Sequence, residues 1–225
     1  MILYVVTETA KRYRAGTGWF ATKLLLEKLS GDSCLVIHYK QVSAKALADM
    51  RPWAICHSGS GTLYSKYDVL QWRPYRQAVL DCDVAQIGFC GGHQILAHFF
   101  GCTLGPIRRL RPGEHDPSPY SPGHFKEWGV YPVRIVRRDP IFAGLPKVIR
   151  VQEYHFWEVK KLSPELVLLA STDECRVQAY VHRDRPVYGT QFHPEASPKT
   201  YTDGLKLLRN FFRVARDYSR ARAEA

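Results

Sequence analysis

One stretch decides how this chain folds: Val84-Ala85-Gln86-Ile87-Gly88-Phe89-Cys90-Gly91-Gly92-His93-Gln94-Ile95-Leu96. The short apolar run before Cys90 predicts a buried strand, and the apolar spacing after it predicts a helix. A strand, a sharp turn and a helix with a nucleophile at the turn form a nucleophile elbow. Gly88 and Gly92 would supply the room that such a tight turn needs, because they carry no Cβ.

The helix that starts just after Cys90 also bears on its chemistry. Free backbone N–H groups and the positive end of the helix dipole would face the sulfur and favour the thiolate, which is the reactive form. The ordinary alternative is a small buried hydrophobe, since most cysteines only pack. We interpret the other five cysteines as packing residues: Cys34, Cys56, Cys82, Cys102 and Cys175.

A second stretch lies far downstream: Val187-Tyr188-Gly189-Thr190-Gln191-Phe192-His193-Pro194-Glu195. A cysteine that must also protonate a leaving group needs a base, and the base needs a carboxylate to orient it. His193 and Glu195 are two positions apart, so in extended backbone they project to the same side. Pro194 favours an extended His193 and a strand end. Alone, His-Pro-Glu is more often a turn than a site.

Together, Gly-Phe-Cys-Gly-Gly-His-Gln and Gln-Phe-His-Pro-Glu resemble the signatures of class I glutamine amidotransferases. The resemblance extends from the first strand to about Phe212. It implies a catalytic triad of Cys90, His193 and Glu195. It also implies a flavodoxin-like, doubly wound, mostly parallel α/β sheet with extra antiparallel strands in the C-terminal half.

The same resemblance assigns further site residues. Backbone N–H groups of Gly59 or Ser60, in the loop Ser58-Gly59-Ser60-Gly61-Thr62, and of Gly91 would form the oxyanion hole. Many members carry Ser-Gly-Gly-Pro at this loop, whereas γ-glutamyl peptidases show a similar Ser-Gly-Ser. The loop could also be an ordinary glycine turn.

Gln94, Tyr154 and His155 would contact the substrate on the basis of the same resemblance. Gln94 could instead satisfy loop backbone groups. Tyr154 and His155 could belong to a core aromatic cluster with Phe156 and Trp157.

The spacing of apolar residues supports this fold class independently. It predicts strands and helices in alternation, which favours a parallel sheet with helices on both faces. The expected elements of the first half are 3–6, 18–29, 34–38, 44–50, 53–57 and 70–80. In the helix over 18–29, Phe20, Leu24, Leu25 and Leu29 share the expected inner face. Later segments read as short, largely antiparallel strands followed by a helix: 130–136, 148–153, 166–170, 176–181, 187–192 and 205–215.

Two segments do not fit the regular pattern. Residues 105–128 are irregular, rich in proline and basic at Arg108, Arg109 and Arg111. We expect this insertion to form a rim or lid over the site, with a solvated loop as the alternative. Residues 216–225 form a charged tail that we expect to fray.

Composition bounds the class of protein. The chain has 225 residues and is 45% hydrophobic, which suits one domain, residues 1–225. It lacks a long apolar run, and the opening 1–6 is too short for the core of a signal peptide. Six cysteines without paired spacing indicate a reducing compartment, so we expect a cytoplasmic protein. No Cys-x-x-Cys pair is present and the motifs require no cofactor, so we expect no metal site.

The net charge of +11 makes nucleic acid a candidate partner. The basic residues are scattered, however, and no nucleic-acid motif occurs, so an acidic substrate, an acidic partner subunit or solubility is preferred. We therefore expect an enzyme that hydrolyses the γ-amide of glutamine for a separate synthetase. A free-standing γ-glutamyl hydrolase or peptidase is the first alternative. A silent relative that binds a partner or nucleic acid is the second.

Overall fold

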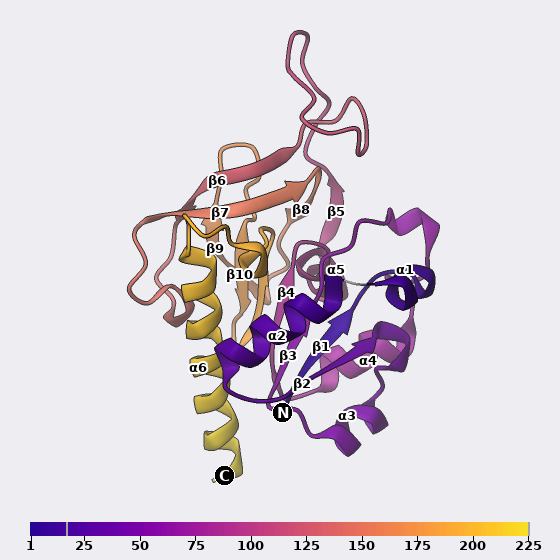
Figure 1. Cartoon of the computed structure of the whole chain (residues 1–225), viewed down its shortest axis with the longest axis vertical. Helices are drawn as coiled ribbons and strands as arrows, with labels where there is room; N and C mark the ends of the chain where they lie inside the picture. The colour runs from indigo at the N-terminus through magenta and orange to yellow at the C-terminus, as the bar shows by residue number, and fades with distance from the viewer. Residues whose placement is uncertain (17, 225) are drawn as a thin grey trace.

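The computed structural model describes residues 1–16 and 18–224, and its centre is a nine-stranded sheet (Figure 1). The strand order is β2-β1-β3-β4-β11-β10-β9-β6-β7. The first five strands in this order run parallel: β2 Cys34–His38, β1 Ile2–Val6, β3 Ala54–His57, β4 Ala85–Phe89 and β11 Val187–Thr190. The other four pair antiparallel: β10 Ala179–His182, β9 Leu166–Ser171, β6 Glu127–Ile135 and β7 Val148–His155. The predicted fold class is confirmed.

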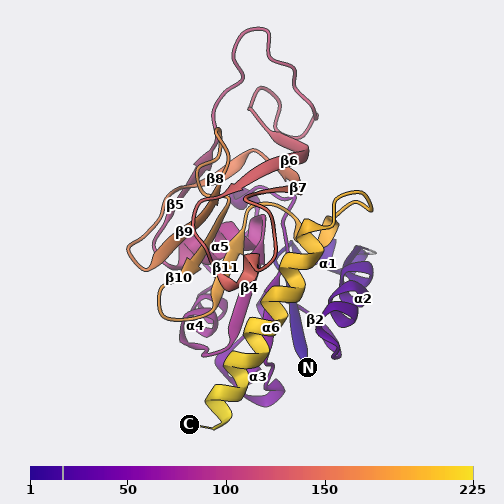
Figure 2. The ribbon, with the colours of Figure 1, turned by 90° about the vertical axis from the view of Figure 1, so that its left-hand side faces the viewer.

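Helices cover both faces of the parallel half (Figures 1 and 2). One face packs against α2 Gly18–Ser30 and α6 Asp203–Ala223, and the other against α3 Ala44–Met50, α4 Arg73–Asp81 and α5 Gly91–Phe99. Within β1, Tyr4 points to the first face, whereas Leu3 and Val5 point to the second. Burial on both faces explains why β1 is a continuous apolar run rather than an alternating one. None of the helices in the described ranges is long and apolar enough to cross a membrane.

The carboxyl ends of the parallel strands bring together segments that are far apart in the sequence. Thr7 follows β1, Ser58 follows β3, Cys90 follows β4 and Gln191 follows β11. Ligands of open α/β sheets bind at this edge. The sheet order therefore places both sequence motifs at one edge, because β4 and β11 are neighbours.

The structure departs from the expected elements in several places. It adds α1 Ala10–Ala15 and a separate pair of strands, β5 Thr103–Pro106 and β8 Trp157–Lys161, besides short 3₁₀ helices. The prediction that Phe20 and Leu24 lie on the inner face of α2 is wrong, because these side chains are 62% and 48% exposed. Leu29 packs inward as expected, and Trp19 and Leu26 do so in place of Phe20 and Leu24. The apolar residues of α2 occupy more than one face, so periodicity alone could not choose between them.

Helix α6 is longer than expected and includes most of the segment that we expected to fray. It continues to Ala223, while residue 225 lies outside the described residues. Tertiary contacts hold the extension. The Arg216 guanidinium donates to the carbonyl of Ser30 at 2.9 Å and lies 4.3 Å from the ring centroid of Trp53. Arg222 forms an ion pair of 2.6 Å with Asp83.

The insertion 105–128 projects from the body as a long hairpin (Figures 1 and 2). It is more ordered than its composition suggests. Arg108 lies between Glu114 and Glu174, with N–O distances of 2.6 and 2.8 Å. Asp116 forms an ion pair with the buried Lys126. Part of the basic cluster is therefore neutralised within the protein.

Candidate active site

Cys90 occupies the turn between β4 and α5 in a backbone conformation that is rare for a residue with a side chain, φ +46° and ψ −101°. The neighbouring glycines explain how the turn closes. A Cβ on Gly88 would lie 2.4 Å from the carbonyl carbon of Gly92, and one on Gly92 would lie 2.4 Å from the carbonyl oxygen of His57. The predicted elbow geometry is present, with β4 packed directly against the first turn of α5.

We expect Gly88→Ala to lower the free energy of unfolding by about 2–3 kcal/mol, because the added methyl overlaps backbone that cannot move away. Urea denaturation measures the change. Gly18→Ala is the matched control, since a Cβ there meets no atom within 4 Å. Equal stability of Gly88→Ala and wild type would contradict the close packing of the elbow.

His193 and Glu195 follow β11, next to the elbow. The N–H of Cys90 donates to Thr190 O at 2.8 Å, which joins the two strand ends. Nδ1 of His193 lies 2.8 Å from Oε1 of Glu195. A Cβ on Gly59 would lie 2.8 Å from Cε1 of His193 and 3.6 Å from Cβ of Cys90, so the imidazole and the cysteine meet over this glycine. The structure brings the three side chains together.

The charge state of His193 follows from these neighbours. Burial acts to lower its pKa, but the Glu195 carboxylate and the Cys90 sulfur outweigh burial and raise the pKa well above its ordinary value. His193 is therefore an imidazolium at neutral pH. A positive charge therefore lies beside the sulfur of Cys90.

The loop after β3 lies against the elbow. A Cβ on Gly91 would lie 2.6 Å from the backbone nitrogen of Ser60. Within the described ranges, no hydrogen bond occupies the backbone N–H of Gly59 or Ser60. These donors and that of Gly91 thus gather beside Cys90, where the resemblance implies an oxyanion hole.

Two pockets meet at Cys90. The Gln94 pocket is largely aromatic, with Tyr64, Tyr120, Tyr154, Phe156 and Trp157 among its lining residues. The Arg12 pocket opens on the side of the imidazole, and its lining includes Trp19, Gly59, Trp128, His193 and Glu195. Tyr120, which belongs to the projecting insertion 105–128, lines both pockets.

Gln94 has a fixed orientation in its pocket. Its Nε2 donates to Trp157 O at 2.8 Å and to Gln191 Oε1 at 3.0 Å, while its Oε1 accepts from the Tyr64 hydroxyl at 2.8 Å. Gln191 also lies 3.7 Å from Sγ of Cys90. Sequence reasoning missed Tyr64 and Gln191, although Gln191 lies inside the second motif.

The two remaining candidates differ. Tyr154 is 41% exposed and its ring centroid lies 5.7 Å from that of His193, so it can reach a ligand. His155 is buried, and its ring nitrogens are bonded within the protein, Nδ1 to Trp157 O at 2.9 Å and Nε2 to Glu127 at 3.0 Å. The imidazole therefore has no free nitrogen for a substrate.

His155 belongs to a buried charge cluster. Burial acts to lower its pKa, but Glu127 and Glu153 raise the pKa well above its ordinary value. Glu127, His155 and Cys175 bring metal-binding atoms within 4.8 Å of one another. However, Glu127 already accepts hydrogen bonds from Thr172 and Gln178, each at 2.5 Å, and lies 3.0 Å from Nε2 of His155. We interpret the cluster as a hydrogen-bonded support of the pocket wall.

We expect Glu153→Gln to gain stability relative to wild type as the pH rises from about 5 to about 8. Burial raises the pKa of Glu153 from 4.5 to about 7. Between these values the folded chain keeps a proton that the unfolded chain has released, so the wild type loses stability with rising pH. Urea midpoints across this range test the prediction, with the exposed Glu165→Gln as control. Parallel curves for Glu153→Gln and wild type would refute it.

The sheet is doubly wound, and its elbow places a cysteine beside a histidine–glutamate pair. These features define a class of enzymes with a cysteine nucleophile. The family model "Glutamine amidotransferase class-I" matches residues 40–215. The chain belongs to the class I glutamine amidotransferase family, and the resemblance seen in its motifs is confirmed.

The chain is also similar to curated proteins. It is 34% identical over 165 residues to the glutamine-hydrolyzing subunit of GMP synthase from Pyrococcus furiosus, a match that spans 73% of this chain and 77% of that protein. The protein of the same name from Pyrococcus abyssi is 36% identical over 132 residues, 59% of this chain and 61% of that one.

Solved structures share the fold. A protein of Thermoplasma acidophilum, described as a GMP synthase subunit, matches with a TM-score of 0.77 and 24% identity, covering 99% of this chain and 98% of that chain. A glutamine amidotransferase of Thermotoga maritima matches with a TM-score of 0.63 and 15% identity, covering 96% and 97%. At these identities the likeness concerns the fold.

Proposed function

We propose that this protein hydrolyses the γ-amide of glutamine through a cysteinyl thioester and releases glutamate and ammonia for a separate synthetase. Family membership supports this proposal, as do relatives whose name includes glutamine hydrolysis. The main structural support for this function is that Cys90, His193 and Glu195 lie together at the ends of the neighbouring strands β4 and β11.

The reaction starts with attack of the Cys90 thiolate on the carbonyl carbon of the γ-amide. An S–C bond forms, and the carbonyl electron pair moves to the oxygen. Backbone N–H groups of Gly59 or Ser60 and of Gly91 stabilise this oxyanion, each by about 3 kcal/mol. His193 gives its proton to the nitrogen as the C–N bond breaks, and ammonia leaves.

The second half restores the enzyme. His193, now neutral and still oriented by Glu195, takes a proton from water as the water oxygen attacks the thioester. The S–C bond breaks, glutamate leaves, and the thiolate and imidazolium are restored. The Gln94 pocket would hold the glutamyl part of the substrate, with Gln94 and Tyr154 as its contacts.

A separate synthetase would take up the ammonia. The names of the relatives favour a synthetase of the GMP synthase type. The partner would cover the Arg12 pocket, because His193 delivers the leaving nitrogen on that side. We also propose a cytoplasmic location, which suits a chain whose six cysteines are free thiols.

One observation favours a second function. The Arg12 pocket extends beyond His193 and carries a guanidinium and two indole rings, so it has room for a leaving group larger than ammonia. A free-standing hydrolase of γ-glutamyl amides or peptides would use such a pocket for the departing amine, with Arg12 facing an acidic group.

Ammonia and glutamate release from the purified chain tests both proposals. We expect hydrolysis of glutamine that increases when a GMP synthase-type synthetase and its substrates are added. Rapid hydrolysis of γ-glutamyl peptides by the chain alone, with slow hydrolysis of glutamine, would replace the first function with the second. Absence of turnover on all of these substrates would contradict both and favour a silent relative.

A further inference from the structure

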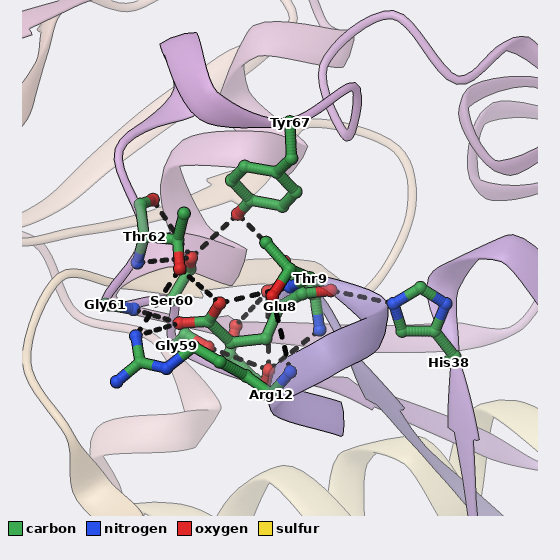
Figure 3. A network of polar contacts seen from close by, with 11 residues as sticks. Glu8, Thr9, Arg12, His38, Gly59, Ser60, Gly61, Thr62 and Tyr67 are labelled. Carbon is green, nitrogen blue, oxygen red and sulfur yellow. Dashed lines mark hydrogen bonds and ion pairs between the residues drawn. The ribbon is translucent and has the colours of Figure 1, made fainter. Parts of the chain in front are cut away.

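A buried glutamate beside the site has no part in the reaction described above. Glu8 follows β1, and its side chain is 3% exposed. Oε1 accepts from the N–H of Gly61 at 2.6 Å and from Arg12 at 2.8 Å. Oε2 accepts from the hydroxyl of Thr62 at 2.6 Å and from the N–H of Thr9 at 3.1 Å (Figure 3). Four donors on one carboxylate hold this side chain in one position.

Two of these donors belong to the loop that carries the proposed oxyanion donors, residues 58–62. Gly61 and Thr62 are its last residues, so Glu8 holds the loop at its far end. The near end is held by Thr7, whose N–H donates to the Ser58 hydroxyl at 2.9 Å and whose hydroxyl donates to Ser58 O at 2.9 Å. Both anchors come from the segment after β1.

The middle of the loop is confined between these anchors and the elbow. A Cβ on Gly59 would lie only 2.8 Å from Cε1 of His193, and a Cβ on Gly91 would lie only 2.6 Å from the nitrogen of Ser60. The Ser60 hydroxyl also lies 2.7 Å from that of Tyr67, which donates to Thr7 O at 2.9 Å (Figure 3). The position of the Gly59 and Ser60 N–H groups relative to Cys90 therefore depends on both anchors.

We propose that Glu8 is a positioning residue that fixes the oxyanion loop against Cys90. The inference rests on the proposed function, because it concerns the hydrolysis carried out at Cys90. Oxyanion donors act at about 2.7–3.1 Å from the oxygen, so a loop displaced by a fraction of an ångström loses most of their effect. The Arg12 guanidinium, 2.8 Å from Oε1 of Glu8, offsets part of the negative charge that Glu8 brings to the loop.

This role predicts a specific kinetic pattern. The oxyanion exists only after attack, so its stabilisation affects kcat and leaves substrate binding almost unchanged. Alkylation of Cys90 by iodoacetamide displaces iodide at a saturated carbon and forms no oxyanion. The alkylation rate reports the thiolate and its approach, and it is independent of the loop.

The test is Glu8→Gln, which keeps the shape of the side chain but removes its charge. One carboxylate oxygen becomes an NH₂ group, which cannot accept the two hydrogen bonds that this oxygen receives. We expect kcat for glutamine to fall by about 10- to 100-fold. We expect KM and the rate of Cys90 alkylation, followed by mass spectrometry, to stay within about twofold of wild type.

Glu27→Gln is the matched control. Glu27 also pairs with a cation four positions away, Lys23, and accepts from a backbone N–H in another segment, that of Cys34. Cys34 is the first residue of β2, so it lies at the amino ends of the parallel strands, whereas the site lies at their carboxyl ends. This variant should keep wild-type kcat.

Thr62→Val provides a second variant, since it removes one loop donor to Glu8 with little change in shape. If Glu8→Gln does not fold, Thr62→Val decides the question, with a smaller fall in kcat expected at unchanged alkylation. Unchanged kcat in the folded variants would overturn the inference, as would equal losses of kcat and alkylation. A wild-type chain without turnover would instead refute the proposed function.

Discussion

Cys90→Ala is expected to reduce glutamine hydrolysis by about 10⁴-fold or more, because no other group can form the thioester. The oxyanion donors and His193 would remain, but they have no bound intermediate to act on. Ammonia release with glutamine, in the presence of the synthetase, measures the loss. Turnover by Cys90→Ala at a rate near that of wild type would refute the assignment of the nucleophile.

The control for this variant is its stability. Cys90 has a φ of +46°. Alanine keeps the Cβ and therefore the backbone strain, whereas glycine removes both. Cys90→Gly should resist urea at least as well as Cys90→Ala, since strain of this kind amounts to about 1–3 kcal/mol. Inactivity with full stability in both variants separates a chemical role from a structural one.

Glu195→Gln is expected to lower kcat by about 10²- to 10³-fold. The carboxylate holds Nδ1 of His193 at 2.8 Å and raises the pKa of the imidazole. Without its charge, His193 loses its proton at a lower pH and is free to take the wrong tautomer. The imidazolium beside the Cys90 sulfur is then absent over part of the neutral range.

The pH dependence of Cys90 alkylation by iodoacetamide tests this explanation. In wild type the imidazolium persists above its ordinary pKa, and the transition caused by its deprotonation lies at correspondingly high pH. In Glu195→Gln this transition should move to lower pH. A lower kcat with an unmoved transition would mean that Glu195 acts otherwise than through the charge of His193.

Local sequence was enough to predict the elbow and the pair beside it. Gly88 excludes a Cβ because the backbone of Gly92 lies 2.4 Å away, a steric reason that acts within a few residues, whereas Gly92 itself packs against His57 of another strand. The i, i+2 spacing of His193 and Glu195 is likewise local, and the two groups lie within hydrogen-bonding distance. The alternation of strands and helices then indicated the edge of the sheet at which they meet.

Contacts between distant segments could not be predicted. Glu8 is one acidic residue after a strand, and its partner Gly61 is 53 positions away. The family resemblance assigns His155 to the substrate, but it does not reveal the bond of its ring to Glu127, 28 positions away. The length of α6 depends on contacts of Arg216 with Ser30, 186 positions earlier.

The place of β11 in the sheet has a consequence for folding. This last strand inserts between β4 and β10, and Gln191 meets Cys90 across 101 positions of chain. Such distant pairings form slowly, because a long segment must first be ordered. During synthesis on the ribosome, the thiol therefore exists for some time without its base. Because Cys90 acts with His193, the reaction can begin only after β11 has taken its place beside β4.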